Sequence, residues 1–391
     1  MTGIDSVLAS REMVLVAGSG GVGKTTVAAA MGIAAAARQR RKVLVLTVDP
    51  ARRLATALGL DDFGSEPVEV DRRLLPGRAR GELWAAMLDT KAGWDELIRR
   101  HAPDDATRDA VLANPLYQNI TSRFVHSHEY LAMEKLHELH AAGEFDLVIV
   151  DTPPSRHALS ILDAPARMRE FFGSRLLRWL TVPYRSRLFT FASRPFYQVA
   201  DRVLGSRFLQ DIADFFILFQ AMEAGFVQRA RDVEQLLGDP RTAFVVVTTL
   251  ETAPSHEARY LVRELHRRDM TVGAVVANRV VPAALATDEA AVAAEHLLAA
   301  VAGDPSAADE HTALVDAVGA RLDAAPATVA TTLAHIAERF DDIALVAGRE
   351  TQRRQELADL APTIALPWLD DDVHDLDGLA VLAERLRRPI D

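Results

Sequence analysis

The sequence of 391 residues contains no cysteine, and only four of its 44 basic residues are lysines (Lys24, Lys42, Lys91 and Lys135). Without cysteine, the chain has no disulfides, no thiolate metal sites and no thiol catalysis. Because lysine is so scarce, a lysine at a position that catalytic chemistry requires is informative.

Long apolar runs and an excess of positive charge are also absent. The sequence has no run of 18 apolar residues that would predict a membrane span. Its first residues, Met-Thr-Gly-Ile-Asp-Ser, lack the basic and apolar regions of a signal peptide, so we expect a cytoplasmic protein. The net charge of −11 argues against nucleic acid as a partner, since phosphate backbones are bound by basic surfaces.

A glycine-rich stretch at residues 13–26 carries the strongest functional signal. Val14–Ala17 predicts a buried strand, an alanine-rich run to about Ala37 predicts a helix, and the loop between them fits the Walker A pattern G-x-x-x-x-G-K-[ST]. In such a loop, backbone N–H groups bind phosphate oxygens, the lysine reaches the β- and γ-phosphates, and the hydroxyl of Thr25 binds Mg²⁺. The sequence therefore predicts ATP and Mg²⁺ as cofactors. The predicted phosphate-binding residues are Gly18, Ser19, Gly20, Gly21, Val22, Gly23, Lys24, Thr25 and Thr26.

Two aspartates follow buried strands further along the chain. The apolar run 42–48 ends at Asp49, and the run 146–150 ends at Asp151. Open parallel sheets bind ligands at the carboxyl ends of their strands, and a second carboxylate downstream of a P-loop suits Mg²⁺. Each aspartate would also suit a helix N-cap, which is the structural alternative.

The remaining pattern predicts an α/β fold: a P-loop NTPase with a mostly parallel, doubly wound sheet and an all-helical insertion. Further strands are expected at 83–88, 242–248, 270–277 and 363–366. We expect the first part of the ATPase core at 1–163, the helical insertion at 164–238, and the second part of the core at 239–391, with an alanine-rich helical segment at 283–361.

The insertion is rich in phenylalanine, with ten of the fifteen phenylalanines between Phe171 and Phe226. Apolar residues follow helical spacing there, and two neighbours make the helix apolar on a second side. Such a helix is either buried core or a surface for another apolar helix, and both interpretations stay open here. The residues concerned are Ile212, Phe215, Phe216, Ile217, Leu218, Phe219, Met222 and Phe226.

Together these features resemble the ArsA family of ATPases, which includes arsenite-pump ATPases and targeting factors for tail-anchored membrane proteins. The resemblance rests on the P-loop at 18–25, Thr-Val-Asp-Pro-Ala at 47–51, Asp-Thr-Pro-Pro-Ser-Arg-His at 151–157, the helical insertion, Asn278 and Pro367. The paired ArsA-like ATPases of actinobacteria resemble the chain most.

The resemblance implies a role for each matching position. Asp49 would orient the attacking water and act with Lys24 as a catalytic residue, and Asp151 would contact Mg²⁺ through water. Asn278 and Pro367 would hold the adenine. The resemblance also implies a nucleotide-gated dimer, formed with a related ArsA-like subunit or with itself, and a hydrophobic helical client for the insertion.

Two departures from the family pattern matter. Without cysteine, the chain can form neither the zinc pair of targeting members nor the metalloid site of arsenite pumps. The family's P-loop usually begins Lys-Gly-Gly, with this lysine reaching across the dimer to the partner's phosphates, whereas Ser19 stands at that position.

The function expected from the sequence is a Mg²⁺-dependent ATPase that couples hydrolysis to conformational change. A weakly hydrolysing or non-hydrolysing regulatory subunit of a heterodimeric ATPase is the alternative, and Ser19 favours it. A role in partitioning or division-site positioning, as in the related ParA/MinD group, is weakened by the acidic charge and the missing tail helix.

Overall fold

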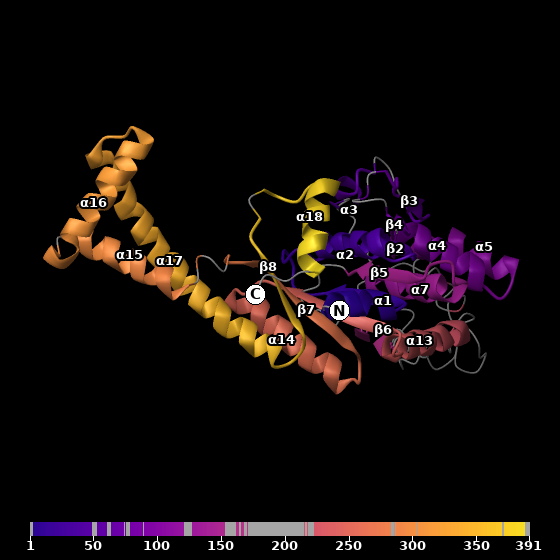
Figure 1. Ribbon diagram of the computed structural model, residues 1–391. Coiled ribbons are helices and arrows are strands. Elements are labelled where there is room, and N and C mark those ends of the chain that lie inside the picture. Colours follow the sequence, from indigo (N-terminus) through magenta and orange to yellow (C-terminus); the bar gives the residue numbers. More distant parts are fainter. Residues whose placement is uncertain are drawn as a thin grey trace.

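The computed structural model describes residues 3–48, 53–60, 64–73, 75, 79–88, 90–120, 127–152, 162–163, 166–167, 170, 215, 217, 223–282, 285, 287–302, 304–369 and 371–387. In the described residues, a central sheet separates two helical layers, and a helical arm projects from one end of the sheet (Figure 1).

The sheet has eight strands in the order β3-β4-β2-β5-β1-β6-β7-β8. All neighbouring strands pair in parallel except β3 and β4, which are antiparallel. The strands are β1 (Met13–Ala17), β2 (Lys42–Thr47), β3 (Val68–Glu69), β4 (Glu82–Met87), β5 (Leu147–Asp151), β6 (Thr242–Thr248), β7 (Val272–Val280) and β8 (Thr363–Pro367). Strand β1 lies near the middle of the sheet, so the loop that follows it opens at the centre of the carboxyl edge.

Helices cover both faces, as a doubly wound sheet requires. They are α1 (Gly3–Ser10), α2 (Lys24–Arg38), α3 (Arg53–Ala57), α4 (Thr90–His101), α5 (Asp105–Ala113), α6 (Pro115–Ile120), α7 (Ser127–Ala142), α13 (Glu223–Gly238), α14 (Thr252–Arg267), α15 (Asp288–Val301), α16 (Pro305–Leu322), α17 (Pro326–Ala358) and α18 (Leu376–Arg387). None of these described helices is both long enough and apolar enough to cross a bilayer.

Two hydrophobic cores lie on opposite faces of the sheet. Side chains that alternate along β1 divide between them: Val14 and Val16 pack with α1, α2 and α18, whereas Met13 and Leu15 pack with α4, α7, α13 and α14. The alanines of α2 suit this position because small side chains let the helix lie close to the strands, and eleven of its residues are buried. The first strand is therefore held from both sides.

The arm is formed by α15, α16 and α17, drawn in orange to yellow in Figure 1, with α16 at its far end. Helix α17 returns from the arm to the sheet, where it packs against β7 and β8. At its base the Glu350 side chain accepts a hydrogen bond from the Val281 N–H (2.8 Å), and Arg353 donates to the Leu250 carbonyl (2.6 Å). Burial raises the pKa of Glu350 above its ordinary value. These contacts fix the base of the arm to the loops that follow β6 and β7.

The sequence predicted the parallel sheet and most of its strands correctly, but not every element. The short helix α1 and the two-residue strand β3 were not expected, and the 283–361 segment was expected only as helical, without its projection as an arm. The division into domains stays a prediction, since most of the 164–238 insertion lies outside the described residues.

Candidate functional site: a phosphate-binding loop at the centre of the sheet

The loop between β1 and α2 has the backbone geometry of a phosphate cradle. Gly18 and Gly23 have φ angles of 152° and 94°, in the region that only glycine adopts without strain. A Cβ atom at Gly18 would lie 2.0 Å from the Val247 carbonyl oxygen, and one at Gly23 would lie 2.4 Å from the amide nitrogen of Asn278. Glycine is therefore required at both positions, because of the positive φ angle and because of the close contact with β6 or β7.

The residues that follow the loop bring a cation, a hydroxyl and a carboxylate together. Lys24 is buried, and its Nζ donates to the Ser19 carbonyl oxygen at 2.8 Å. Thr25 Oγ1 donates to Asp151 Oδ2 at 2.6 Å, and Thr47 Oγ1 donates to the same oxygen at 3.0 Å. Asp151 is buried at the end of β5, so the carboxylate that the sequence placed after an apolar strand does meet the P-loop hydroxyl.

Asn278 contacts the loop from β7. Its Nδ2 donates to the Val22 carbonyl oxygen at 2.9 Å. The β7–β8 register shifts directly after it, between Asn278 and Val280, and Arg279 has a positive φ of 58°. A bulge of this kind re-aims the neighbouring side chains. Pro367 pairs with Val280 in β8, so the two residues expected at the adenine come to the same edge of the sheet, while the amide of Asn278 also braces the P-loop.

Ser19 has a partner that the sequence did not predict. Its hydroxyl donates to the Oε2 atom of Glu257 at 2.5 Å, and Glu257 is an exposed residue of α14. A carboxylate thus lies beside the phosphate loop at the position where the family pattern has a lysine. Its negative charge opposes that of a bound nucleotide.

We expect Glu257→Gln to raise the affinity of the isolated chain for ATP by about two- to fivefold at low salt, because one repulsive charge is removed. Titration calorimetry measures the change, and the gain should shrink as salt screens the charge. Glu289→Gln, an exposed carboxylate of α15, is the matched control and should leave the affinity unchanged. Equal affinity in all three proteins at low salt would contradict the electrostatic argument.

Some of the predicted features cannot be placed. Asp49 and residues 153–157, most of the Asp-Thr-Pro-Pro-Ser-Arg-His motif, lie outside the described residues. So do most of the phenylalanines of the insertion. Of the apolar residues of the insertion listed in the sequence analysis, Phe215 and Phe226 are 2% and 0% exposed. Both belong to the core, which agrees with the buried-core interpretation for these two residues.

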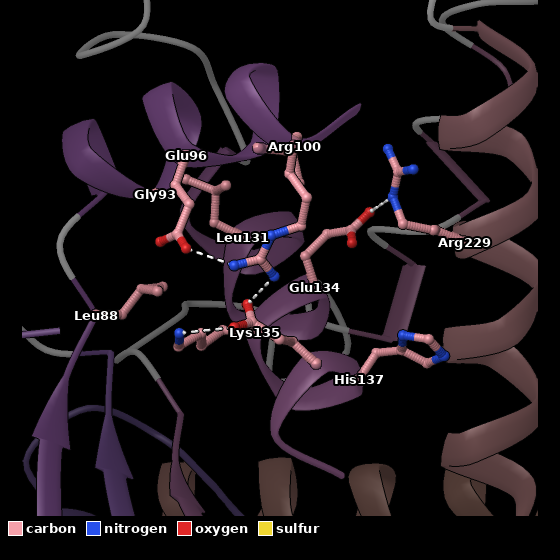
Figure 2. Close-up of a pocket in the computed structure, with 11 residues that line it drawn as sticks. Leu88, Gly93, Glu96, Arg100, Leu131, Glu134, Lys135, His137 and Arg229 are labelled. Carbon is pink, nitrogen blue, oxygen red and sulfur yellow. Dashed lines mark hydrogen bonds and ion pairs between the residues drawn. The ribbon is translucent and has the colours of Figure 1, made fainter. Parts of the chain in front are cut away.

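A cavity of about 330 Å³ lies away from the phosphate loop, between α4, α7 and α13 (Figure 2). None of the predicted site residues is among those described as lining it. Its charges are joined in pairs: Arg100 with Glu138 at 2.9 Å, and Arg229 with Glu134, also at 2.9 Å. Burial alone would raise the pKa of Glu138, but its bonds to Arg100 and Lys135 outweigh burial and hold the pKa below its ordinary value.

These pairs give the cavity a structural role. The ion pair between Arg229 and Glu134 joins α13 to α7, and within α13 the Arg229 guanidinium lies over the Phe226 ring, 4.9 Å from its centre, which orients the arginine. The cavity therefore marks where the end of the insertion is attached to the core.

Taken as a whole, the site has the parts that phosphoryl transfer from a nucleotide requires: a glycine cradle, a lysine, a hydroxyl and a strand-end carboxylate at the centre of a parallel sheet. This arrangement defines a P-loop NTPase. The sequence model of the ArsA family, described as anion-transporting ATPases, matches residues 11–296, and the chain belongs to this family.

Individual relatives agree with the family. The chain is 23% identical over 287 residues to an ATPase ASNA1 homolog of Entamoeba dispar, covering 71% of the chain and 80% of the relative. It is 26% identical over 271 residues to the ATPase GET3 of Malassezia globosa, covering 69% and 73%. It is 30% identical over 275 residues to the uncharacterized protein SCO2128 of Streptomyces coelicolor, covering 68% and 62%. The chain is accordingly an ATP-hydrolysing enzyme of the ArsA type, and the non-hydrolysing alternative is not favoured.

Proposed function

We propose that the chain is one subunit of a Mg²⁺-dependent, dimeric ArsA-type ATPase, and that a related subunit supplies the cation that its own P-loop lacks. Lys24 and the loop N–H groups hold the β- and γ-phosphates, and Asp49 orients the attacking water. Asn278 and Pro367 hold the base. The dimer closes around ATP and opens after hydrolysis.

Thr25 and Asp151 are the residues that would hold Mg²⁺. A hydroxyl and a carboxylate 2.6 Å apart are oxygen donors of the kind that this ion prefers, and their hydrogen bond keeps both at the end of the P-loop. When bound, the ion supplies positive charge to the β- and γ-phosphate oxygens.

The observation that carries the heterodimer is the pairing of Ser19 with Glu257 beside an otherwise complete site. In related phosphoryl-transfer enzymes, a cation supplied by a partner protein raises kcat by factors of about 10³–10⁵. A serine bonded to a carboxylate supplies no positive charge. A homodimer would lack this charge at both sites. A related subunit with lysine at this position would complete the site in our chain.

The test is the turnover of the purified chain with and without an added cation. Alone, the chain should hydrolyse ATP slowly, and Ser19→Lys should raise the rate at least about tenfold by promoting a closed homodimer. Glu257 could pair with the new lysine within one chain. The double variant Ser19→Lys/Glu257→Gln should therefore hydrolyse ATP at least as fast as Ser19→Lys. Light scattering with ATP present reports the dimer.

Ser19→Ala is the matched control. It removes the hydrogen bond to Glu257 without adding charge, so its rate should stay as low as that of the unmodified chain. Fast turnover by the unmodified chain alone, or an equal gain from Ser19→Ala, would overturn the heterodimer proposal.

We do not extend the proposal to a hydrophobic client. The two phenylalanines of the insertion that the structure describes, Phe215 and Phe226, lie in the core, where they are unavailable to another helix.

A further inference from the structure

Thr47 is a buried polar residue to which neither the sequence motifs nor the proposed function gives a role. It ends β2, where the preceding residues Val43–Leu46 are apolar and buried, and it is itself 1% exposed. A hydroxyl in such surroundings costs free energy unless it is hydrogen-bonded, and valine, which has a similar size, is at least as well suited to a strand. A threonine at this position therefore needs a specific partner.

That partner is the carboxylate of Asp151. Thr47 Oγ1 donates to Asp151 Oδ2 at 3.0 Å, and Thr25 Oγ1 donates to the same oxygen at 2.6 Å. The hydroxyls are the donors, because an ionised carboxylate only accepts hydrogen bonds. Thr47 thereby differs from three other buried threonines, whose hydroxyls donate to backbone carbonyls: Thr152, Thr242 and Thr248.

The pairing of β2 with β5 brings the two residues together. Thr47 and Asp151 are the last residues of these parallel neighbouring strands, and they pair in register. Side chains in register on neighbouring strands point to the same face of the sheet, so the hydroxyl and the carboxylate meet at its carboxyl edge. The Val48 N–H also donates to the Asp151 carbonyl oxygen, at 3.2 Å. The end of β2 therefore binds Asp151 through both backbone and side chain.

The two hydroxyls differ in what the proposed function requires of them. Thr25 is the second residue of α2 and is itself expected to bind Mg²⁺, whereas Thr47 belongs to the sheet. Both Thr47 and Asp151 are 1% exposed, and in an interior shielded from water a hydrogen bond to a charged acceptor is strong. Thr47 therefore orients Asp151 independently of the hydroxyl that is expected to bind the ion.

We propose that Thr47 is a positioning residue, which holds the Asp151 carboxylate in the orientation that Mg²⁺ binding requires. The inference rests on the proposed function, in which Thr25 and Asp151 hold the ion. Residues that hydrogen-bond metal-binding carboxylates orient them, and changing such a residue typically weakens metal affinity by about 10- to 100-fold. Thr47 acts through Asp151 and takes no part in the binding of ATP without the metal.

The test compares the binding of ATP to the full chain in Mg²⁺ and in EDTA by titration calorimetry. Thr47→Val keeps the shape of the side chain and removes the hydroxyl, so it should weaken the binding of Mg·ATP by about 10- to 100-fold. The affinity for ATP in EDTA should stay within about twofold, because the phosphate loop is unchanged. Thr47→Ser keeps the hydroxyl and should bind Mg·ATP nearly as well as the unmodified chain.

A second matched pair keeps the test decisive if Thr47→Val does not fold. Thr47→Ser and Thr47→Ala differ only in the hydroxyl, so Thr47→Ala should lose Mg·ATP affinity and Thr47→Ser should not. Thr242→Val is the control. Thr242 is also 1% exposed, but it begins β6, at the opposite edge of the sheet, and its hydroxyl donates to the Leu236 carbonyl oxygen at 2.7 Å. This variant should bind Mg·ATP as the unmodified chain does.

Loss of Mg·ATP affinity in Thr47→Val and Thr47→Ala, but not in Thr47→Ser or Thr242→Val, would support the proposal. A loss that followed side-chain size, an equal loss in EDTA, or no loss in any variant would overturn it and leave the proposed function intact. If the unmodified chain bound ATP equally well in Mg²⁺ and in EDTA, the Mg²⁺-dependent function would itself fail, and this inference with it.

Discussion

Lys24→Ala is expected to lower the affinity of the chain for ATP by about 10- to 150-fold. The lysine is buried behind the phosphate loop, where a charge-assisted hydrogen bond contributes about 1.5–3 kcal/mol, and about 1.4 kcal/mol corresponds to a factor of ten. In the described structure its Nζ donates to the Ser19 carbonyl, so the loop itself holds the cation in place before phosphate arrives. Titration calorimetry with ATP measures the loss.

Lys42→Ala is the matched control for this variant. Lys42 begins β2, at the opposite edge of the sheet from the P-loop, and its Nζ lies over the rings of Trp84 and Phe145. Its removal should leave ATP affinity unchanged. An unaltered affinity in Lys24→Ala, with the fold intact by circular dichroism, would refute the assignment of the loop as the phosphate site.

Asp49→Asn should lower kcat by about 10²–10⁴ and leave ATP affinity within about threefold. A residue that orients the attacking water acts on the transition state, so its loss affects turnover far more than binding. Asp49 lies outside the described residues, and the expectation rests on its place after the strand at 42–48 and on the resemblance of Thr-Val-Asp-Pro-Ala at 47–51 to the ArsA family. Single-turnover hydrolysis and calorimetry, in the unmodified chain and in Ser19→Lys, separate the two quantities.

Asp151→Asn gives the contrasting behaviour. Because Asp151 is buried and bonded to both Thr25 and Thr47, its change should reduce Mg²⁺-dependent ATP binding as well as turnover. Asp71→Asn, at an exposed loop carboxylate paired with Arg73, should change neither. If Asp49→Asn lost binding and turnover equally, Asp49 would be a structural cap rather than a catalytic group.

The parallel sheet and the phosphate loop could be predicted from the sequence because each depends on local pattern. A short apolar run bounded by glycine predicts a buried strand, and the spacing of glycines before Lys24 is determined by the phosphate cradle that they form. Asp151 could be predicted for a similar reason, since a carboxylate at the end of a parallel strand lies at the binding edge.

Contacts between distant segments could not be predicted in the same way. Ser19 and Glu257 are 238 positions apart, and Asn278 meets Val22 across 256 positions. Strand pairing brings these residues together, and neither the spacing of motifs nor the composition of the sequence predicts such contacts. Helix α1 has no glycine loop or strand-end acid to mark it, and the arm's projection depends on where α17 packs.

The length of α17 has a mechanical consequence. The 25 residues from Pro326 to Glu350 form one uninterrupted helix about 36 Å long, and its base is bonded to the segments that follow β6 and β7 beside the phosphate loop. A tilt of about 5° at the base would therefore move the far end by about 3 Å. The helix acts as a lever, which converts small displacements at the nucleotide edge into movements at the tip as large as an atomic diameter.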